Sequence, residues 1–302
     1  MRRLIVNADD FGFTAGVNRG ILEAHTRGIV TSSTLMANGP AFDHAVRLAK
    51  AVPGFSIGCH VVLIDGEPVS DSKLLPSLTT PSAGGRRFRD GLKAFAARAL
   101  AGRLNPREIE IEVSAQIRKL QGAGIDVSHV DTHKHTHMFP AVLRPVLRAA
   151  RACGVRAVRN PFGPGKPLKS SQLLKRPGLW TRHAEVRVLS SLAAKFRDAV
   201  RREDFITPDG TLGIEVTGAL DENLFRAVAA IIPQGTWEFV CHPGYNDEDL
   251  KSAKTRLRES RETELHVLTI PEARQVLLDH GITLISYREL IAPQTGTYTT
   301  SA

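Results

Sequence analysis

The stretch HVDTHKHTHMFP (129–140) holds four of the eleven histidines of this 302-residue chain. Three of them alternate along the sequence, with one residue between each pair. In an extended strand, side chains of one parity point the same way, so Asp131, His133, His135 and His137 would share a face if the strand continues through them. Burying three imidazoles without partners costs free energy that packing does not return, so this face predicts a metal site.

Other groups capable of chemistry follow other candidate strands. These are Asp9 and Asp10 in NADDFGF, His60 in GCHVVL, Arg159 in VRNP, and His242 and Tyr245 in CHPGY. Taken alone, each has an ordinary structural explanation, as a turn, a helix cap or a core histidine. In parallel α/β folds, however, the carboxyl ends of the strands meet at one rim. Their shared position at strand ends therefore predicts a single site.

The types of these residues indicate a reaction. One carboxylate and two imidazoles form a ligand set that leaves positions open for water and substrate on a divalent cation. A second carboxylate beside the ion would accept a proton from bound water, and His242 would protonate a departing amine. The cation itself would acidify the water and polarise a carbonyl. This combination predicts metal-dependent amide hydrolysis, with Zn²⁺ suited to the ligands and Mg²⁺ an alternative.

The elements that must position these groups alternate along the chain. Apolar or β-branched runs predict strands near 4–6, 29–36, 56–63, 127–131, 157–159, 212–216, 238–241 and 282–285. Helical patterns lie between most of them, at 17–26, 41–51, 106–122, 140–153, 220–232 and 271–280. The alternation predicts an α/β fold with seven or eight parallel strands, either a barrel or an open sheet. Segments 65–91 and 161–208 break it and are predicted to be insertions after strands.

The amino-acid composition indicates the broad class of protein. With 42% hydrophobic and 24% charged residues, the chain is typical of one large soluble domain, followed by a polar tail at 293–302. Its first apolar run, 4–6, is far shorter than the core of a signal peptide, and no apolar stretch reaches the ~18 residues of a membrane span. The odd number of cysteines, three, fits reduced thiols. We therefore expect a cytoplasmic protein.

The positive charge of the chain is concentrated in one region. Between Arg144 and Arg202 there are fifteen Lys or Arg and two acidic residues, a balance of +13 against +9 for the whole chain. Such a region suits an anionic partner, a nucleic acid or lipid headgroups, or is simply a solvated face. Nucleic acid is disfavoured because aromatic residues make up only 6% of the chain and no recognised binding motif is present. A phosphohydrolase would use similar metal ligands, but the sequence has no Gly-rich phosphate loop.

The motifs NADDFGF, TSSTLM, GCHVVL, DTHKHTHMFP, VRNP and CHPGY, in this order, resemble the YdjC-like carbohydrate deacetylase family, which includes chitooligosaccharide deacetylase. The resemblance extends from the first predicted strand to about Tyr287. It implies a single-domain distorted (β/α) barrel over 1–292. It also implies an enzyme that uses one divalent metal ion to remove acetyl groups from N-acetylated sugars.

The resemblance implies a role for each motif residue. The catalytic base falls on Asp9, and the metal ligands fall on Asp10, His60 and His133. Spacing alone does not decide which histidine of the tract binds the ion, and the other two would support the site or contact substrate.

Four further residues belong to this expected pocket. Arg159 and His242 match motif positions that line it, His242 as the general acid. Arg159, Tyr245 and His137 are the expected substrate contacts.

Within the family, NGPAFDHAVRLA and CHVVLIDGEPV most resemble the branch associated with hopanoid biosynthesis. This branch implies deacetylation of an N-acetylglucosaminyl hopanoid, with soluble chitooligosaccharides as the alternative. A lipid substrate would require contact with an anionic membrane, on the inner membrane face for a cytoplasmic enzyme. Leu189, Leu192, Phe196 and Val200 form a helical stripe among basic residues that would either lie on this membrane or pack on the barrel.

Overall fold

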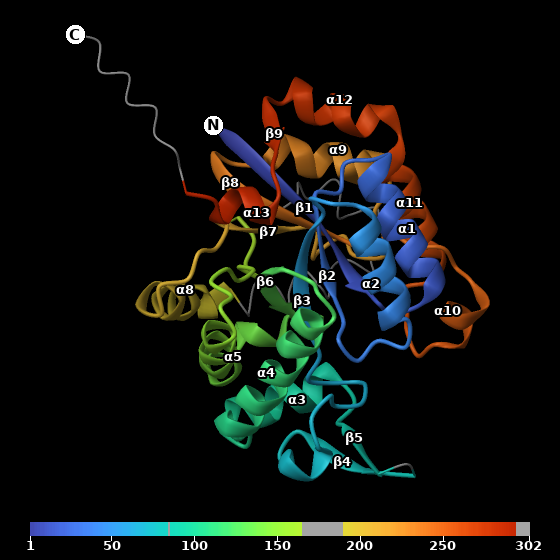
Figure 1. Cartoon of the computed structure of the whole chain (residues 1–302). Coiled ribbons are helices and arrows are strands. Elements are labelled where there is room, and N and C mark those ends of the chain that lie inside the picture. Colours follow the sequence, from blue (N-terminus) through green and yellow to red (C-terminus); the bar gives the residue numbers. More distant parts are fainter. Residues whose placement is uncertain (84, 165–189, 294–302) are drawn as a thin grey trace.

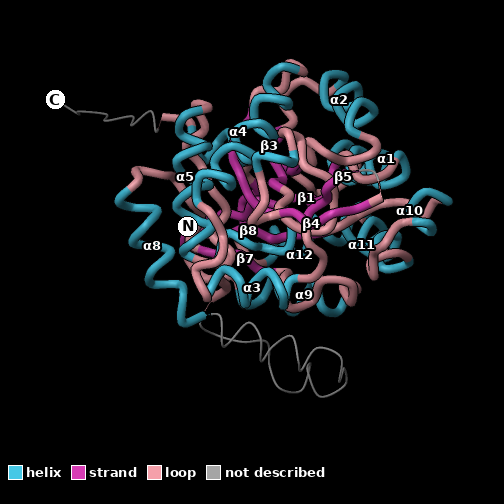
Figure 2. Tube along the Cα trace, turned by 90° about the horizontal axis from the view of Figure 1, so that it is seen from below, coloured by secondary structure: helices cyan, strands magenta, loops and turns pink. Residues whose placement is uncertain are grey.

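The computed structural model describes residues 1–83, 85–164 and 190–293, in which helices surround a curled, parallel sheet (Figures 1 and 2). The sheet contains β1 (Arg2–Phe11), β2 (Ser32–Leu35), β3 (Ser56–Val61), β6 (Val127–Thr132), β7 (Gly210–Leu212), β8 (Gly235–Cys241) and β9 (Ile282–Leu284). The strand order is β6-β3-β2-β1-β8-β7, and β9 pairs with the start of β1. All of these pairings are parallel. The carboxyl ends of the strands therefore lie at one rim.

Backbone hydrogen bonds bring the two edges of this sheet together. The segment 156–162 exchanges bonds with Val130 of β6 on one side. On its other side it bonds to Ile206, and Thr211 of β7 donates its N–H to the carbonyl of Phe162. The sheet thus curls into a distorted barrel, and the expected strand at 157–159 is present only as isolated bridges. The expected α/β class and barrel architecture are confirmed.

Helices connect most of the strands, and local signals mark the start of several of them. The longer ones are α1 (Ala15–Thr26), α2 (Phe42–Ala51), α3 (Leu92–Leu100), α4 (Pro106–Gly122), α5 (Pro140–Ala152), α8 (Ala193–Arg202), α9 (Glu222–Ile231), α11 (Glu259–Thr269) and α12 (Pro271–Asp279). Shorter helices are α10 (Glu248–Ser252), α13 (Tyr287–Ile291), and the 3₁₀ turns η1 (Ser72–Leu74), η2 (His133–Met138) and η3 (Ser190–Leu192). Proline opens α4 and α5, and the side chain of Thr14 caps α1.

Alternation along β1 separates the helix-facing side of the barrel wall from its interior. Leu4, Val6 and Ala8 pack in the main hydrophobic core beneath the helices. Ile5, of opposite parity, packs instead with Ala157, Ile285 and Tyr287 in a small second cluster. Asn7 and Asp9 continue the parity of Ile5 towards the carboxyl end. The interior of the barrel therefore changes from apolar to polar as it approaches the rim.

The first predicted insertion is an ordered structure. Within 65–91 lie η1 and the antiparallel hairpin of β4 (Thr79–Ser82) and β5 (Gly85–Phe88), which projects from the barrel in Figure 1. Buried carboxylates on α4 hold it: Glu112 accepts the N–H groups of Val69 and Ser70, and Glu108 accepts that of Ser77.

The second insertion is described only in part, because 165–189 lies outside the described residues. In the remainder, α8 packs beside α5 at the edge of the molecule (Figure 2). Phe196 and Val200 are buried, and the ring of Phe196 contacts those of His137 and Phe162. Of the two alternatives for the amphipathic stripe, Phe196 and Val200 follow the second and pack on the barrel. Leu189 lies outside the described residues, and among those described no helix is long and apolar enough to cross a membrane.

Candidate metal centre and active site

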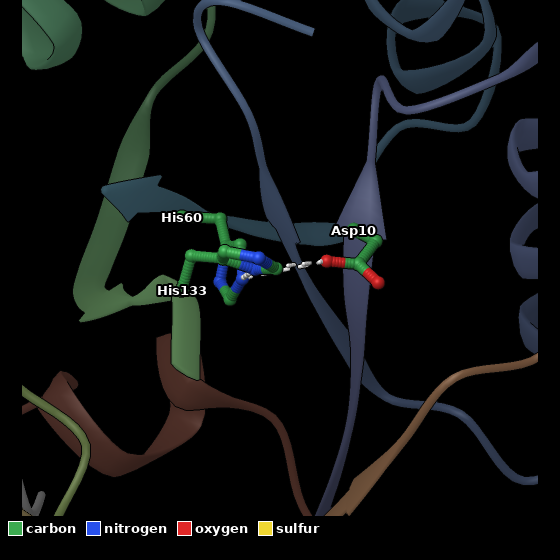
Figure 3. A group of neighbouring side chains, drawn as sticks. All are labelled: Asp10, His60 and His133. Carbon is green, nitrogen blue, oxygen red and sulfur yellow. Dashed lines mark hydrogen bonds and ion pairs between the residues drawn. The ribbon is translucent and has the colours of Figure 1, made fainter. Parts of the chain in front are cut away.

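Three side chains from three strand ends converge at the rim (Figure 3). Asp10 comes from β1, His60 from β3, and His133 from the first residue after β6. Asp10 Oδ1 lies 3.5 Å from His60 Nε2 and 3.5 Å from His133 Nδ1, and the two nitrogens are 3.3 Å apart. Metal bonds of about 2.0–2.1 Å at tetrahedral angles separate neighbouring ligand atoms by about 3.3 Å. The triangle therefore fits a small divalent cation.

An unusual backbone conformation allows both adjacent aspartates to face the site. In a regular strand, Asp9 and Asp10 would point to opposite faces. Asp10 instead has a φ of 68°, in the left-handed region that aspartate tolerates better than most residues. Its carboxylate consequently turns to the rim, beside that of Asp9.

The far side of the His60 ring is anchored by Asp131, which was predicted to share the face of the metal site but was not assigned as a ligand. His60 Nδ1 donates to Asp131 Oδ1 at 2.8 Å, and both side chains are buried. A carboxylate behind a ligating histidine fixes which nitrogen faces the metal and makes it more basic. Burial alone would lower the pKa of His60, but the carboxylates of Asp131 and Asp9 raise it to about 9. In the metal-free protein this imidazole therefore carries a proton that a metal must displace.

Asp9 is held by Arg159, a buried cation that pairs with three carboxylates. Arg159 donates to both Asp9 oxygens, at 2.6 and 2.8 Å, and also contacts Asp131 at 2.5 Å and Glu238 at 2.7 Å. Asn7 donates to Asp9 Oδ1 at 2.9 Å. Burial raises the pKa of Asp9, but Arg159 outweighs it and holds the pKa far below its ordinary value. Asp9 is therefore ionised at neutral pH.

His242, at the end of β8, faces Asp9 across the site. Its Nε2 lies 4.0 Å from Asp9 Oδ2. Its backbone N–H donates to Glu264 Oε2 at 2.6 Å, and its Nδ1 lies 4.0 Å from the same oxygen. Burial lowers the pKa of His242 against the raising effect of Glu264 and Asp10. The ring is thus neutral at neutral pH and able to take up and release a proton.

The histidine tract departs from the predicted alternation. The strand ends at Thr132, and within η2 both Lys134 and His135 have a φ of 54°, so the extended face does not continue. His133 alone of the tract joins the ligand triangle. His135 belongs to the rim, and its buried Nδ1 has no hydrogen-bond partner within the described residues.

The three expected substrate contacts, His137, Arg159 and Tyr245, have other partners in the structure. His137 is fully buried: its Nδ1 bonds to Thr132 Oγ1 at 2.7 Å, and its Nε2 bonds to the carbonyl of Arg159 at 3.1 Å. Arg159 is also fully buried and occupied by carboxylates. Tyr245, in the loop after β8, packs against α1, with its hydroxyl bonded to Glu23 and its ring beneath Arg19. His137 and Arg159 therefore help to hold the site, Tyr245 lies beside α1, and the substrate contacts expected of all three stay predictions.

Two buried residues of α11 support the site although no sequence motif marked them. Arg261 donates to Asp10 Oδ2 at 2.5 Å, and Glu264, one turn later, accepts the N–H of His242. A third such residue, Glu238, was included in a predicted strand but given no role. It receives the Nε–H of Arg159 at 2.8 Å and the hydroxyl of Tyr287 at 2.6 Å. A charged residue inside an apolar strand run was the only available signal for Glu238.

The sequence and the fold of this chain are similar to those of known proteins. Residues 3–279 match the family model described as YdjC-like protein. A carbohydrate deacetylase from Brevibacillus brevis is 36% identical over 95% of this chain and 99% of its own length. A chitooligosaccharide deacetylase from Escherichia fergusonii is 31% identical over 96% of this chain and 99% of its own length. A solved structure from Enterococcus faecalis, described as a cellobiose-phosphate cleavage protein, is 25% identical with a TM-score of 0.75, covering 96% of this chain and 98% of that one.

Proposed function

The chain belongs to the YdjC-like family, and from that premise we propose that it is a metal-dependent carbohydrate N-deacetylase. It hydrolyses the acetamide of an acetylated amino sugar, with one divalent ion held by Asp10, His60 and His133. The observation that carries the proposal is the ligand triangle with ionised Asp9 beside it and neutral His242 opposite Asp9. The names of the relatives support an acetylated sugar as substrate.

Each residue of the site has a defined part in the reaction. A bound metal ion would supply the Lewis acidity that activates water and stabilises an oxyanion. Asp9, kept ionised and oriented by Arg159, accepts the proton of the attacking water. His242, whose Nε2 lies 4.0 Å from Asp9 Oδ2, takes up the proton that Asp9 accepted from water and delivers it to the departing amine. Asp9 is buried and the side chain of His242 is only 12% exposed, which limits competing water in these proton transfers.

We further propose that the sugar is the head of a hopanoid lipid, as the branch resemblance implies. A groove of about 900 Å³ between the start of α5 and α8, lined by four basic and two acidic side chains, supports contact with an anionic membrane. Arg144, Lys195 and Arg202 line it and are paired with no carboxylate within the described residues. Each basic side chain near an anionic surface contributes about 1 kcal/mol to binding. Because Phe196 and Val200 are buried, this contact is electrostatic and involves no insertion of their stripe.

Mass spectrometry of candidate substrates before and after incubation tests the assignment. Loss of one acetyl group from an N-acetylglucosaminyl hopanoid, faster than from chitooligosaccharides, supports the lipid substrate. Loss from chitooligosaccharides alone retains the deacetylase and removes the lipid. Release of phosphate from a phosphorylated sugar would indicate a phosphohydrolase instead of a deacetylase. Tight nucleic-acid binding without turnover would indicate a nucleic-acid-binding protein.

A further inference from the structure

The two oxygens of Asp10 have different surroundings. Oδ1 faces the two histidine nitrogens, each 3.5 Å away. Oδ2 receives the Nη2–H of Arg261 at 2.5 Å. A carboxylate whose second oxygen is held by a guanidinium favours binding a metal through the other oxygen, because the positive charge and its hydrogen bond make the held oxygen a weaker metal donor. In this state the protein supplies three ligand atoms.

Arg261 is itself fixed in place. Its side chain is 1% exposed, its Nε donates to the carbonyl of Leu257 at 3.2 Å, and its guanidinium lies over the ring of Phe13 at 5.9 Å. Its carbonyl accepts the N–H of Gly244, in the loop that follows His242. The guanidinium therefore has little freedom to leave Asp10 when an ion arrives.

We propose that Arg261 is a positioning residue that limits Asp10 to one coordinating oxygen and so biases the site towards Zn²⁺ over Mn²⁺. Zn²⁺ in catalytic sites is satisfied by three protein ligands and a water, so it gains little from another carboxylate oxygen. Mn²⁺ favours six ligands and oxygen donors, so it gains more. The inference rests on the proposed metal site and goes beyond it, because it names which ion the site selects and the residue responsible.

The experiment compares the ratio of dissociation constants, Kd(Mn²⁺)/Kd(Zn²⁺), in the metal-free full-length chain, without substrate. The guanidinium charge repels both dications alike, so the ratio reports the ligand effect. We expect Arg261→Met to weaken Zn²⁺ binding by about 10–100-fold, as loss of a residue that holds a ligand does, and Mn²⁺ binding much less. The ratio should then fall by about tenfold or more. Glu264→Gln, on the same buried face of α11, is the matched control and should leave the ratio unchanged.

An unchanged ratio in folded Arg261→Met would overturn the inference. Arg261→Gln, which retains a neutral donor, gives a second reading and should lower the ratio in the same direction. Should neither variant fold, a crystal structure of the Zn²⁺-loaded wild type decides. Asp10 bound through one oxygen with Arg261 on the other supports the inference, and Asp10 bound through both overturns it. Failure of the wild type to bind either ion would instead refute the proposed metal site.

Discussion

The rim of the barrel and the groove between α5 and α8, called the basic face below, both contain several charged groups. The charged groups at the rim are buried and paired, whereas several of those on the basic face are exposed and, in the described part of the chain, unpaired. At the rim, Asp9, Asp10, Asp131 and Arg159 are buried and paired at 2.5–2.9 Å. On the basic face, Arg144, Lys195 and Arg202 are exposed and paired with no carboxylate within the described residues.

This difference shows which charged side chains need a precise geometry. A buried ion without its partner is costly, so each group at the rim depends on its neighbours. An exposed cation is hydrated and screened by salt, so its position can vary. Substitutions at the rim should therefore have large, residue-specific effects, and substitutions on the basic face should have small, additive ones.

The largest effect is expected from the histidine ligands. His60→Ala and His133→Ala should each lose bound metal and reduce turnover below detection, because three ligands leave no redundancy. Metal analysis of the purified variants, with circular dichroism to verify folding, measures this. His135→Ala, from the same tract but outside the triangle, is the control and should retain metal. Full metal occupancy in purified His133→Ala would show that another histidine is the ligand.

Asp9→Asn separates the base from the ligands. The amide cannot accept the proton of the attacking water, so kcat should fall towards the upper end of the about 10²–10⁴-fold range for general acid–base catalysis. Bound metal should remain stoichiometric, whereas Asp10→Asn should weaken metal binding itself. Parallel assays of kcat and metal content distinguish the two, and near wild-type kcat in Asp9→Asn would refute the base assignment.

His242→Ala should reduce turnover of an acetamide by about 10²-fold, the lower end of that range, with bound metal unchanged. The amine is a poor leaving group unless it is protonated, so the loss should shrink for an activated aryl acetate. Comparing kcat for both substrates in the same variant measures the effect. An equally large loss for both would make His242 a residue that positions substrate.

Metal binding should depend on pH through His60. Because the pKa of this imidazole is raised to about 9 in the metal-free protein, a proton competes with the ion below that pH. Apparent affinity should rise by up to about tenfold per pH unit from 6.5 to 9 and then level off. The stability contributed by protonated His60 runs the opposite way: it is fully present below pH 6.5 and lost as pH rises through about 9. Calorimetric metal titrations across this range test the sign, and a pH-independent affinity would contradict it.

The smallest effect is expected on the basic face. Replacing Arg144, Lys195 and Arg202 by glutamate should weaken sedimentation with anionic vesicles at low salt by several-fold, from about 1 kcal/mol per residue. Turnover of a soluble substrate should be unchanged. The matched control replaces three exposed lysines outside this face, Lys50, Lys73 and Lys93, by glutamate. An equal loss of vesicle binding in the two triple variants, or no vesicle binding by the wild type, would show that the basic face is only a solvated, charged surface.

The sequence predicted a residue's position correctly where strand alternation and the ends of the strands determine it. His60, Asp131 and the start of the histidine tract were placed correctly because strand parity and the shared rim of parallel strands are properties of the backbone. The same rule failed at His137, because β6 ends at Thr132 and η2 replaces the extended chain. It would also have separated Asp9 from Asp10, which only a left-handed φ brings together.

Residues on helices behind the site could not be found in this way. Helix α11 was not predicted, because no side chain caps it and its buried face carries Arg261 and Glu264 among apolar residues. Charged residues on a buried face hide the amphipathic pattern by which helices are recognised. Their partners, Asp10 and His242, are far away in the sequence, and only the folded barrel brings them together.

Acetate release from an N-acetylglucosamine derivative is the decisive assay for metal-dependent deacetylation by this protein. Enzyme stripped of metal should release no acetate. Restoring Zn²⁺ should produce acetate and free amine in equal amounts, and Asp9→Asn loaded with Zn²⁺ should remain nearly inactive. Equal acetate release by stripped and reconstituted enzyme, or none from any N-acetylated sugar or glycolipid, would contradict the account.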